Sequence, residues 1–443
     1  MDASATSPES LTSATDTAMD LAAAAHSATD TSGNTPARPE PRAGSATLAV
    51  LTLCAFTLGT GEIMIAGLLP DIAADAGVSL STAGLLVSVF AATVVVGGPV
   101  LALTTSAVGR VRLLVTLFAL FVTGTAMSAL TSSFPLIAGG RVAAALAHSA
   151  LMPLFFGLAA DAVPPQRRGT AVARVSLGFS LATIVGLPLG TAIGHWFSWR
   201  LTFWAVALLA LAAAGPVVAL GRKPYEPTRD GAEAQAGGGT EVGGGKRAGR
   251  LAELRVLGER RVRAVIAVTA LSAAGAFTAY TYITPLLTDT TGFSASATTV
   301  LLLLFGIGGT VGNLVSGRLA DRSVMAAVCA GVAALAAALP LLGATATVKP
   351  LAVVFLFLFG AAYYGVIPAV NTRLMNVAPA RARNFALTVQ SSAFNLGIAL
   401  GGWLGGEVIA SGVSMRWVPV AGGLVTVCAL ALALAESRAR TSA

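Results

Sequence analysis

The sequence predicts an all-α membrane protein in which twelve transmembrane helices form two six-helix bundles related by a parallel repeat. Three observations lead to this fold class. The chain of 443 residues is 55% hydrophobic and 11% charged, with a mean hydropathy of +0.79, whereas about 25% of an ordinary globular chain is charged. Apolar runs long enough to cross a bilayer as helices recur throughout the sequence. The two halves of the chain also repeat one another.

The apolar runs divide into twelve segments, six in each half of the chain. They lie at approximately residues 47–69, 83–105, 111–131, 134–158, 172–194 and 200–220, and then at 263–287, 298–320, 325–345, 350–373, 387–409 and 416–435. Because the number of spans in each half is even, both halves begin on the same side of the membrane. The repeat is therefore parallel, with its axis along the membrane normal.

Three polar stretches lie outside these segments. Residues 1–45 contain no apolar run, so we expect a disordered cytoplasmic tail and not a signal peptide. Residues 221–262 hold a Gly-rich linker followed by a basic stretch, which is either an amphipathic helix on the membrane surface or a charged solvated loop. Residues 437–443 form a second tail. The expected bundles are therefore residues 46–220 and 263–436.

The distribution of basic residues predicts the orientation. With the N-terminus inside, the cytoplasmic segments contain 23 of the 28 Lys and Arg residues, and the outer loops contain only Arg200, Lys349 and Arg416. This asymmetry follows the positive-inside rule and places both termini in the cytoplasm of a cell whose plasma or inner membrane the chain crosses. It also accounts for the net charge of +8 without a nucleic-acid partner.

A shift of 215 residues superposes the two halves without gaps. It places Gly77 on Gly292 and Pro153 on Pro368, among other glycine and proline pairs. Such residues coincide because they set kinks and close contacts between helices. Two six-span bundles joined by a cytoplasmic linker are typical of a transporter whose halves rock against each other.

Three segments carry a resemblance to a known family. The loop after the eighth span reads GRLADRS and resembles a loop motif of the major facilitator superfamily at Gly317, Asp321 and Arg322. The fourth span begins GGRVAAALAHSA and resembles the intramembrane arginine motif of that family at Arg141. Over residues 47–435 the chain is similar to the twelve-span drug:proton antiporters, and within them to bacterial chloramphenicol-efflux and sugar-efflux proteins.

The fifth span adds a motif of small residues. Its sequence GFSLATIVGLPLGTAIG resembles the glycine-proline motif that the family associates with antiporters, at Gly186, Pro188 and Gly190. Glycines recur here at multiples of four, so they share one helix face and allow a neighbouring helix to approach closely. Their role is either packing alone or control of a gate.

The loop motif also leaves two interpretations open. Asp321 and Arg322 lie at a helix end that the orientation places in the cytoplasm, where charge-assisted contacts with other helix ends would hold one conformation closed. The alternative is that they serve the positive-inside distribution alone, which explains Arg322 but not the acid. We therefore favour a gating role.

Glu62 is the candidate proton site. It lies in the segment GTGEIMIAGLLP of the first span, where a charged carboxylate costs roughly 2.5–3.5 kcal/mol on insertion scales. Burial favours the neutral form of a carboxyl group, so the residue suits proton uptake and release. Arg141 is the other deep charge, and the two are either a coupled proton site or a static ion pair. Glu407, near the outer end of the eleventh span, can reach headgroup water.

A group of polar side chains in apolar helices predicts a substrate cavity. Each is either a hydrogen-bonding group between helices or a ligand contact. Together they indicate a mostly apolar cavity for a moderately hydrophobic, largely uncharged small molecule. The group consists of His148, Tyr280, Tyr282, Tyr363, Tyr364, Asn371 and Asn395.

Signatures of other mechanisms are absent from the sequence. It contains no Walker-type loop, no clustered His, Cys and acidic ligands and no G-x-S-x-G segment. We therefore expect no enzyme activity, no metal and no cofactor, with the proton gradient as the energy source. The expected partners are a small-molecule substrate, protons and the lipid bilayer, and the expected state is a monomer.

Three functions remain as hypotheses. The first is proton-coupled efflux of a small amphipathic drug, plausibly a phenicol-type antibiotic. The second is a sugar or metabolite exporter, which the small number of Asn, Gln, Asp and Glu residues in the helices disfavours. The third is a transport-inactive sensor or scaffold, against which the presence of Glu62 and Arg141 argues.

Overall fold

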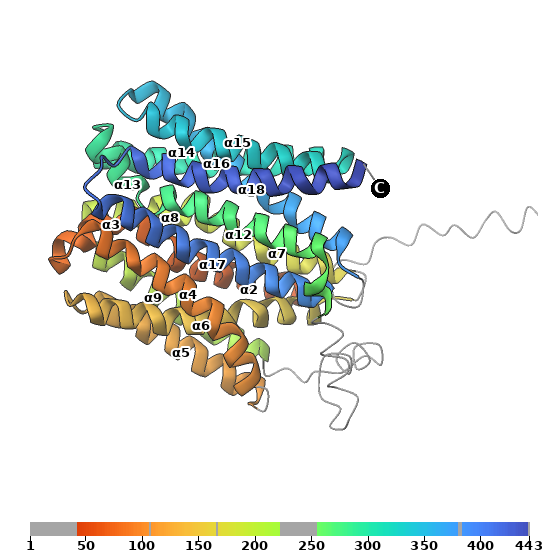
Figure 1. The fold of residues 1–443 in the computed structure, drawn as a ribbon. Coiled ribbons are helices and arrows are strands. Elements are labelled where there is room, and N and C mark those ends of the chain that lie inside the picture. The colour runs from red at the N-terminus through yellow and green to blue at the C-terminus, as the bar shows by residue number, and fades with distance from the viewer. Residues whose placement is uncertain (1–41, 106–107, 165–166, 222–254, 380–382, 442–443) are drawn as a thin grey trace, which may run out of the picture. The chain divides into compact units, whose positions relative to one another are not determined.

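The computed structural model describes residues 42–105, 108–164, 167–221, 255–379 and 383–441 (Figure 1). The expected N-terminal tail lies outside these residues except for its last four, which already belong to the first helix. Most of the expected linker also lies outside them. At its end, the basic stretch contains a short 3₁₀ turn, η3 (Arg255–Gly258), and the start of the seventh span at Arg260.

The first half of the described chain contains the six predicted spans. Two of them are interrupted. The first is divided at Met64, and the fifth contains a π-helix. The elements are α2 (Arg42–Ile63), α3 (Ile65–Ala76), α4 (Leu80–Thr104), α5 (Arg110–Ala129), α6 (Phe134–Asp161), α7 (Arg168–Leu181), the π-helix η2 (Ala182–Gly186), α8 (Leu187–Trp196) and α9 (Trp199–Gly221).

The second half contains the other six spans, and the seventh is the one that is divided. The elements are α12 (Arg260–Tyr280), α13 (Ile283–Pro285), the π-helix η4 (Leu286–Thr290), α14 (Ala295–Arg322), α15 (Val324–Ala344), α16 (Lys349–Val377), α17 (Arg383–Ala410) and α18 (Trp417–Thr441). The predicted all-α fold with twelve membrane-spanning helices is therefore confirmed.

The turns confirm the internal repeat in atomic detail. Gly77 and Gly292, which the 215-residue shift superposes, both have positive φ angles, of 63° and 74°. Glycine adopts this left-handed conformation without the steric penalty of a Cβ atom. Two residues later, Ser79 and Ser294 each accept a hydrogen bond from the main-chain N–H three residues ahead, and so cap α4 and α14. The same local chemistry thus starts the second span of each half.

Packing pairs follow the same repeat. Within the halves, the pairs α5–α9 and α4–α6 correspond to α15–α18 and α14–α16. Between the halves, α4 packs against α17, and α8 packs against α14. The short helices α3 and α13 also meet, and Figure 1 shows them at the end of the long helices remote from the end of α18. We call these the α3 end and the α18 end. The boundaries proposed for the two bundles stay predictions.

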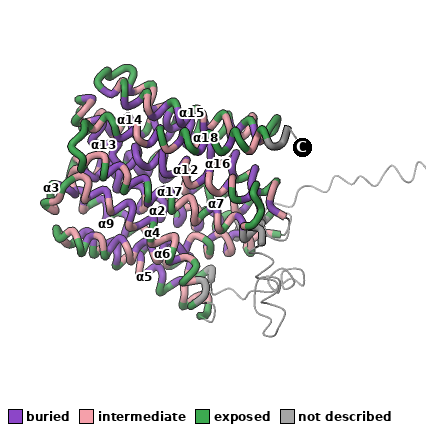
Figure 2. The backbone as a smooth tube through the Cα atoms, viewed as in Figure 1, coloured by how far each residue is buried: buried purple, intermediate pink, exposed green. Residues whose placement is uncertain are grey.

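The outer surface of the helices suits a lipid environment. Large apolar side chains such as Leu208, Leu314 and Leu424 are exposed by more than half of their area. Figure 2 shows that exposed and buried positions alternate along the helices. A bilayer solvates such apolar surfaces, and it requires the backbone hydrogen bonds to close within each helix.

The twelfth predicted segment, residues 416–435, ends one residue before an acid that the helix includes. The last helix continues past residue 435, so that Glu436 lies within the twelfth span. Its side chain is buried and forms an ion pair with the buried Arg373 of α16. The sequence pattern missed this acid because the segment was ended one residue too early, at the point where charged residues begin.

Candidate functional site

The first span breaks beside its glutamate. α2 ends at Ile63, and α3 begins at Ile65. Around Met64 the hydrogen-bond spacing shortens, since the N–H of Gly67 donates to the Met64 carbonyl at 3.0 Å, three residues back. A helix interrupted in the middle of a membrane leaves main-chain carbonyls that need other donors.

Arg141 supplies those donors. From α6 its Nη1 donates to the carbonyl of Gly61 at 2.6 Å, and its Nη2 donates to the carbonyl of Glu62 at 3.2 Å. The guanidinium carbon also lies 4.2 Å from the ring centre of Phe90, a cation–π arrangement. Among the described residues, no ion pair within 4.0 Å joins Arg141 to the Glu62 carboxylate. The static ion pair considered from the sequence is therefore not formed in this conformation.

The carboxylate of Glu62 faces His148 instead. The distance from Oε2 of Glu62 to Nε2 of His148 is 3.5 Å, and the two side chains are 14% and 9% exposed. The edge of the His148 ring also packs against Phe90, with 5.6 Å between ring centres. His148 was predicted as a substrate contact, and the structure places it at the acid.

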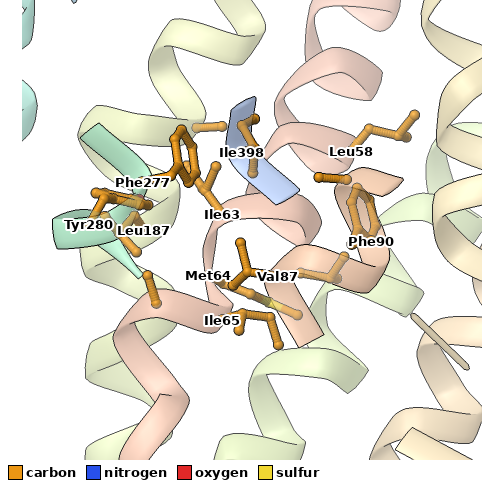
Figure 3. Close-up of a cluster of buried hydrophobic side chains, with 14 of the residues drawn as sticks. Leu58, Ile63, Met64, Ile65, Val87, Phe90, Leu187, Phe277, Tyr280 and Ile398 are labelled. Carbon is orange, nitrogen blue, oxygen red and sulfur yellow. The ribbon is translucent and has the colours of Figure 1, made fainter. Parts of the chain in front are cut away.

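A small cavity adjoins this acid on its other side. It has a volume of about 10 Å³, enough for roughly one water molecule. Figure 3 shows how Phe277, Tyr280 and Ile398 of the second half approach the helix break of the first. The hydroxyl group of Tyr280 is buried and has no hydrogen-bond partner among the described residues. The acid thus lies where the two halves of the chain meet.

A larger cavity lies within the second half. Its volume is about 290 Å³. Among the described residues no charged side chain lines it, and its wall combines apolar side chains with hydroxyl and amide groups. The lining residues are Thr269, Ser272 and Ala273 of α12, Tyr363, Val366, Ile367, Val370 and Asn371 of α16, and Leu387, Gln390, Ser391 and Phe394 of α17.

The predicted substrate residues do not gather in one place. Tyr363 and Asn371 line the larger cavity. Tyr282 donates a hydrogen bond to the Gly402 carbonyl at 3.0 Å, and the amide of Asn395 donates to its own helix. The hydroxyl of Tyr364 donates to Oγ1 of Thr183 at 2.9 Å and so links the two halves.

Four polar residues of the larger cavity were not singled out from the sequence. The hydroxyl residues Thr269, Ser272 and Ser391 escaped notice because such residues are common in membrane helices, where they bond to their own backbone. Gln390 did carry a signal. The other two glutamines of the chain, Gln166 and Gln235, lie outside the twelve predicted segments, so a glutamine within one was a candidate.

The glycine motif of the fifth span packs against the first span, as the spacing predicted. A Cβ atom on Gly178 would collide with the main-chain oxygen of Thr52, and one on Gly186 would collide with the side chain of Thr60. The main-chain oxygen of Gly190 accepts a hydrogen bond of 2.8 Å from Thr202. Close packing is thus a property of this face, whether or not it also controls a gate.

A π-helix occupies the centre of the same motif. η2 covers Ala182–Gly186, and Pro188 follows in the first turn of α8. Proline has no N–H to donate to the carbonyl four residues earlier, and a local π-turn is one way for a helix to absorb this loss. Thr183, the partner of Tyr364, lies in this turn.

The predicted gating loop lies at the α18 end. Asp321 and Arg322 are exposed at the end of α14. In the part of the chain that the structure describes, neither side chain forms an ion pair or hydrogen bond. A Cβ atom on Gly317 would meet open space. The predicted contacts of this loop are therefore not formed in the described conformation.

Comparisons with known proteins agree on one family. Residues 51–401 match the description Major Facilitator Superfamily. The inner membrane transport protein YdhP of Escherichia coli K12 is 34% identical over 391 residues, which cover 88% of this chain and 96% of the relative. A chloramphenicol resistance protein of Streptomyces lividans is 35% identical over 359 residues, covering 80% and 86%.

A solved structure matches the fold. It is a bacterial homologue of the human lysosomal transporter Spinster in an inward-facing and unoccupied conformation. The match has a TM-score of 0.70 at 18% identity and covers 90% of this chain and 98% of that one.

Proposed function

The chain belongs to the Major Facilitator Superfamily, and from this premise we propose that it exports a small, uncharged amphipathic compound in exchange for protons. The observation that carries the proposal is the buried carboxylate of Glu62. It lies at a broken helix, between an ionisable histidine and a water-sized cavity. An acid at such depth in a membrane protein is a functional-site hypothesis by default.

The surroundings of Glu62 suit a group that changes charge. When the carboxylate is ionised, the imidazole of His148 faces it at 3.5 Å, and the Arg141 guanidinium adds a positive charge nearby, at the main-chain carbonyl of Glu62. When it is protonated, it needs neither charge, and the group fits the apolar contacts of Phe277 and Ile398 better. Because those contacts come from the second half of the chain, the charge on Glu62 changes the attraction between the halves. Proton binding to Glu62 is thereby coupled to movement of the two halves relative to each other.

The larger cavity supports an uncharged substrate. The described residues that line it carry no charge, so a buried ion would lack a partner among them. Hydroxyl and amide groups within an apolar wall suit a compound such as a phenicol-type antibiotic, and one relative is named a chloramphenicol resistance protein. The same polar groups also keep a sugar or metabolite exporter as the second candidate.

The proposed orientation places both termini and the α18 end in the cytoplasm. The halves meet through α3 and α13 at the opposite end. The cavity is lined by the middle of α12 and by the parts of α16 and α17 that are nearer the α18 end. In this orientation the described conformation would hold its substrate site in the cytoplasmic half, as an exporter does before release.

A susceptibility panel in a host without its own efflux systems tests this function. Cells expressing the chain should tolerate several-fold more chloramphenicol than cells expressing the Glu62→Gln variant at the same membrane level. Everted vesicles should release protons when the drug is added. Absence of both effects for chloramphenicol and for a panel of uncharged drugs and sugars would overturn the proposal.

A further inference from the structure

Two buried polar atoms in the larger cavity have no hydrogen-bond partner among the described residues. They are the Oγ atom of Ser272 and the Oε1 atom of Gln390. Both residues are 3% exposed, and both line the cavity. A buried polar group without a partner destabilises the structure, because it has lost its hydrogen bonds to water. A ligand that satisfies these atoms would recover this free energy on binding.

The neighbouring hydrogen bonds fix which way the glutamine amide points. Thr269 donates its one hydroxyl proton to the carbonyl of Val265 at 2.9 Å, so its oxygen is left as an acceptor only. The amide nitrogen of Gln390 donates to that oxygen at 3.1 Å. The amide oxygen must then be the free atom. It can only accept, whereas the hydroxyl of Ser272 can donate.

The charge nearest the cavity in sequence is used elsewhere. Arg373 lies two residues beyond the cavity-lining Asn371, but its guanidinium pairs with Glu436 of α18. Among the described residues, the cavity wall therefore offers neither a cation nor an anion. Around the two polar atoms it offers Val366, Leu387 and Phe394, which favour an apolar or aromatic body.

We propose that Gln390 and Ser272 form the polar subsite of the substrate cavity, contained within the second half of the chain. The ligand is an uncharged molecule that presents a hydrogen-bond donor to Gln390 and an acceptor to Ser272, next to an apolar group. A secondary amide or a hydroxyl beside an aromatic ring has this chemistry. The inference rests on the proposed function and names the substrate class and the residues that read it.

The test is equilibrium binding of radiolabelled chloramphenicol to the purified full chain. Chloramphenicol is uncharged and carries an amide and hydroxyl groups beside a ring. Gln390→Met and Ser272→Ala should each weaken binding by about 5- to 30-fold, as expected for one lost hydrogen bond to a buried group. Ser316→Ala is the matched control, because Ser316 is also buried and without a partner but lies on α14, outside the cavity wall. It should leave binding unchanged.

A charge swap makes the site falsifiable even if the apolar variants lose stability. The primary amine obtained by removing the acyl group of chloramphenicol is a cation, which the parent chain should bind at least tenfold more weakly than the drug. Gln390→Glu should reverse this preference. Thermal unfolding of each variant without ligand reports whether it is folded.

Two results separate the site from the function. If vesicles release protons when the drug is added, but Gln390→Met, Ser272→Ala and Gln390→Glu all bind chloramphenicol as the parent chain does, the subsite is wrong and the proposed transport function stands. No binding and no proton release by the parent chain with any uncharged probe would overturn both.

Discussion

The imidazole of His148 faces the carboxylate of Glu62, with 3.5 Å between Nε2 and Oε2. Arg141, seven residues earlier on the same helix, lies on the same face two turns away and donates to the carbonyls of the broken span. Helix α6 thus places two basic groups beside one acid. Arg141 binds the main chain of the first span, and His148 faces the side chain of Glu62.

Glu62→Gln should uncouple transport from the proton gradient. Glutamine keeps the size and hydrogen bonding of the side chain but does not titrate. In everted vesicles the variant should lose uptake driven by a pH gradient and keep substrate binding and downhill exchange. Glu407→Gln is the matched control, because Glu407 is an exposed carboxylate on α17 and its loss should have no effect. Undiminished gradient-driven uptake by Glu62→Gln would make that residue a packing or substrate contact.

His148→Phe should move the pH dependence of transport upward. The phenyl ring keeps the contact with Phe90 but removes the imidazole that faces the Glu62 carboxylate at 3.5 Å, so this acid retains its proton to higher pH. At this distance we expect the contact to contribute about 1.4 kcal/mol, so the pH of half-maximal transport should rise by about one unit. The measurement is substrate-driven proton movement from pH 5 to 9. If His148 were a substrate contact instead, the Michaelis constant would change at an unchanged pH profile.

Gly186→Ala should destabilise the first half of the chain, and a second substitution should repair it. The added Cβ atom would collide with the side chain of Thr60, and overpacking of this kind costs about 1–3 kcal/mol. Thr60→Ala removes the colliding atoms without breaking a hydrogen bond, since Oγ1 of Thr60 has no partner among the described residues. The double variant should regain the unfolding temperature in detergent. If it regains stability but not transport, the glycine face also controls a gate.

Much of this architecture could be predicted from the sequence. Hydropathy located every span, and the shift of 215 residues superposed Gly77 and Gly292, which the structure shows in the same left-handed conformation. The site was harder to predict, because partners of one buried group are set by how helices rotate and break. Arg141 was expected opposite the Glu62 carboxylate, but the break at Met64 freed carbonyls that it contacts instead. Gln390 was overlooked because its importance depends on which neighbours leave its amide oxygen unpaired.

Asp75→Asn should lower stability near neutral pH and have little effect in acid. The hydrogen bond of 2.5 Å from Arg200 holds the pKa of the Asp75 carboxyl group below its ordinary value. A lowered pKa in the folded state means that the ionised acid stabilises the fold above its unfolded pKa and that this contribution is lost as pH falls. The unfolding free energy of the variant should be lower by up to about 1 kcal/mol at pH 7. The difference from the parent chain should disappear as the pH falls below 4, as measured by thermal unfolding in detergent; a constant difference would assign the effect to packing.

Asp321→Asn should impair transport without destabilising the described conformation. The Asp321 side chain is exposed and forms no hydrogen bond or ion pair with the described residues, so the unfolding temperature should not change. If the acid forms a contact only when the α18 end closes, its loss should shift the population toward the conformation described here. A single cysteine at the cavity-lining Ser391, introduced after replacement of the three native cysteines, should then react faster with a thiol reagent. Asp289→Asn, which removes an exposed acid at the α3 end, should change neither the rate of transport nor the rate at which the cysteine reacts. Equal cysteine reactivity and normal transport in Asp321→Asn would assign the loop to membrane topology alone.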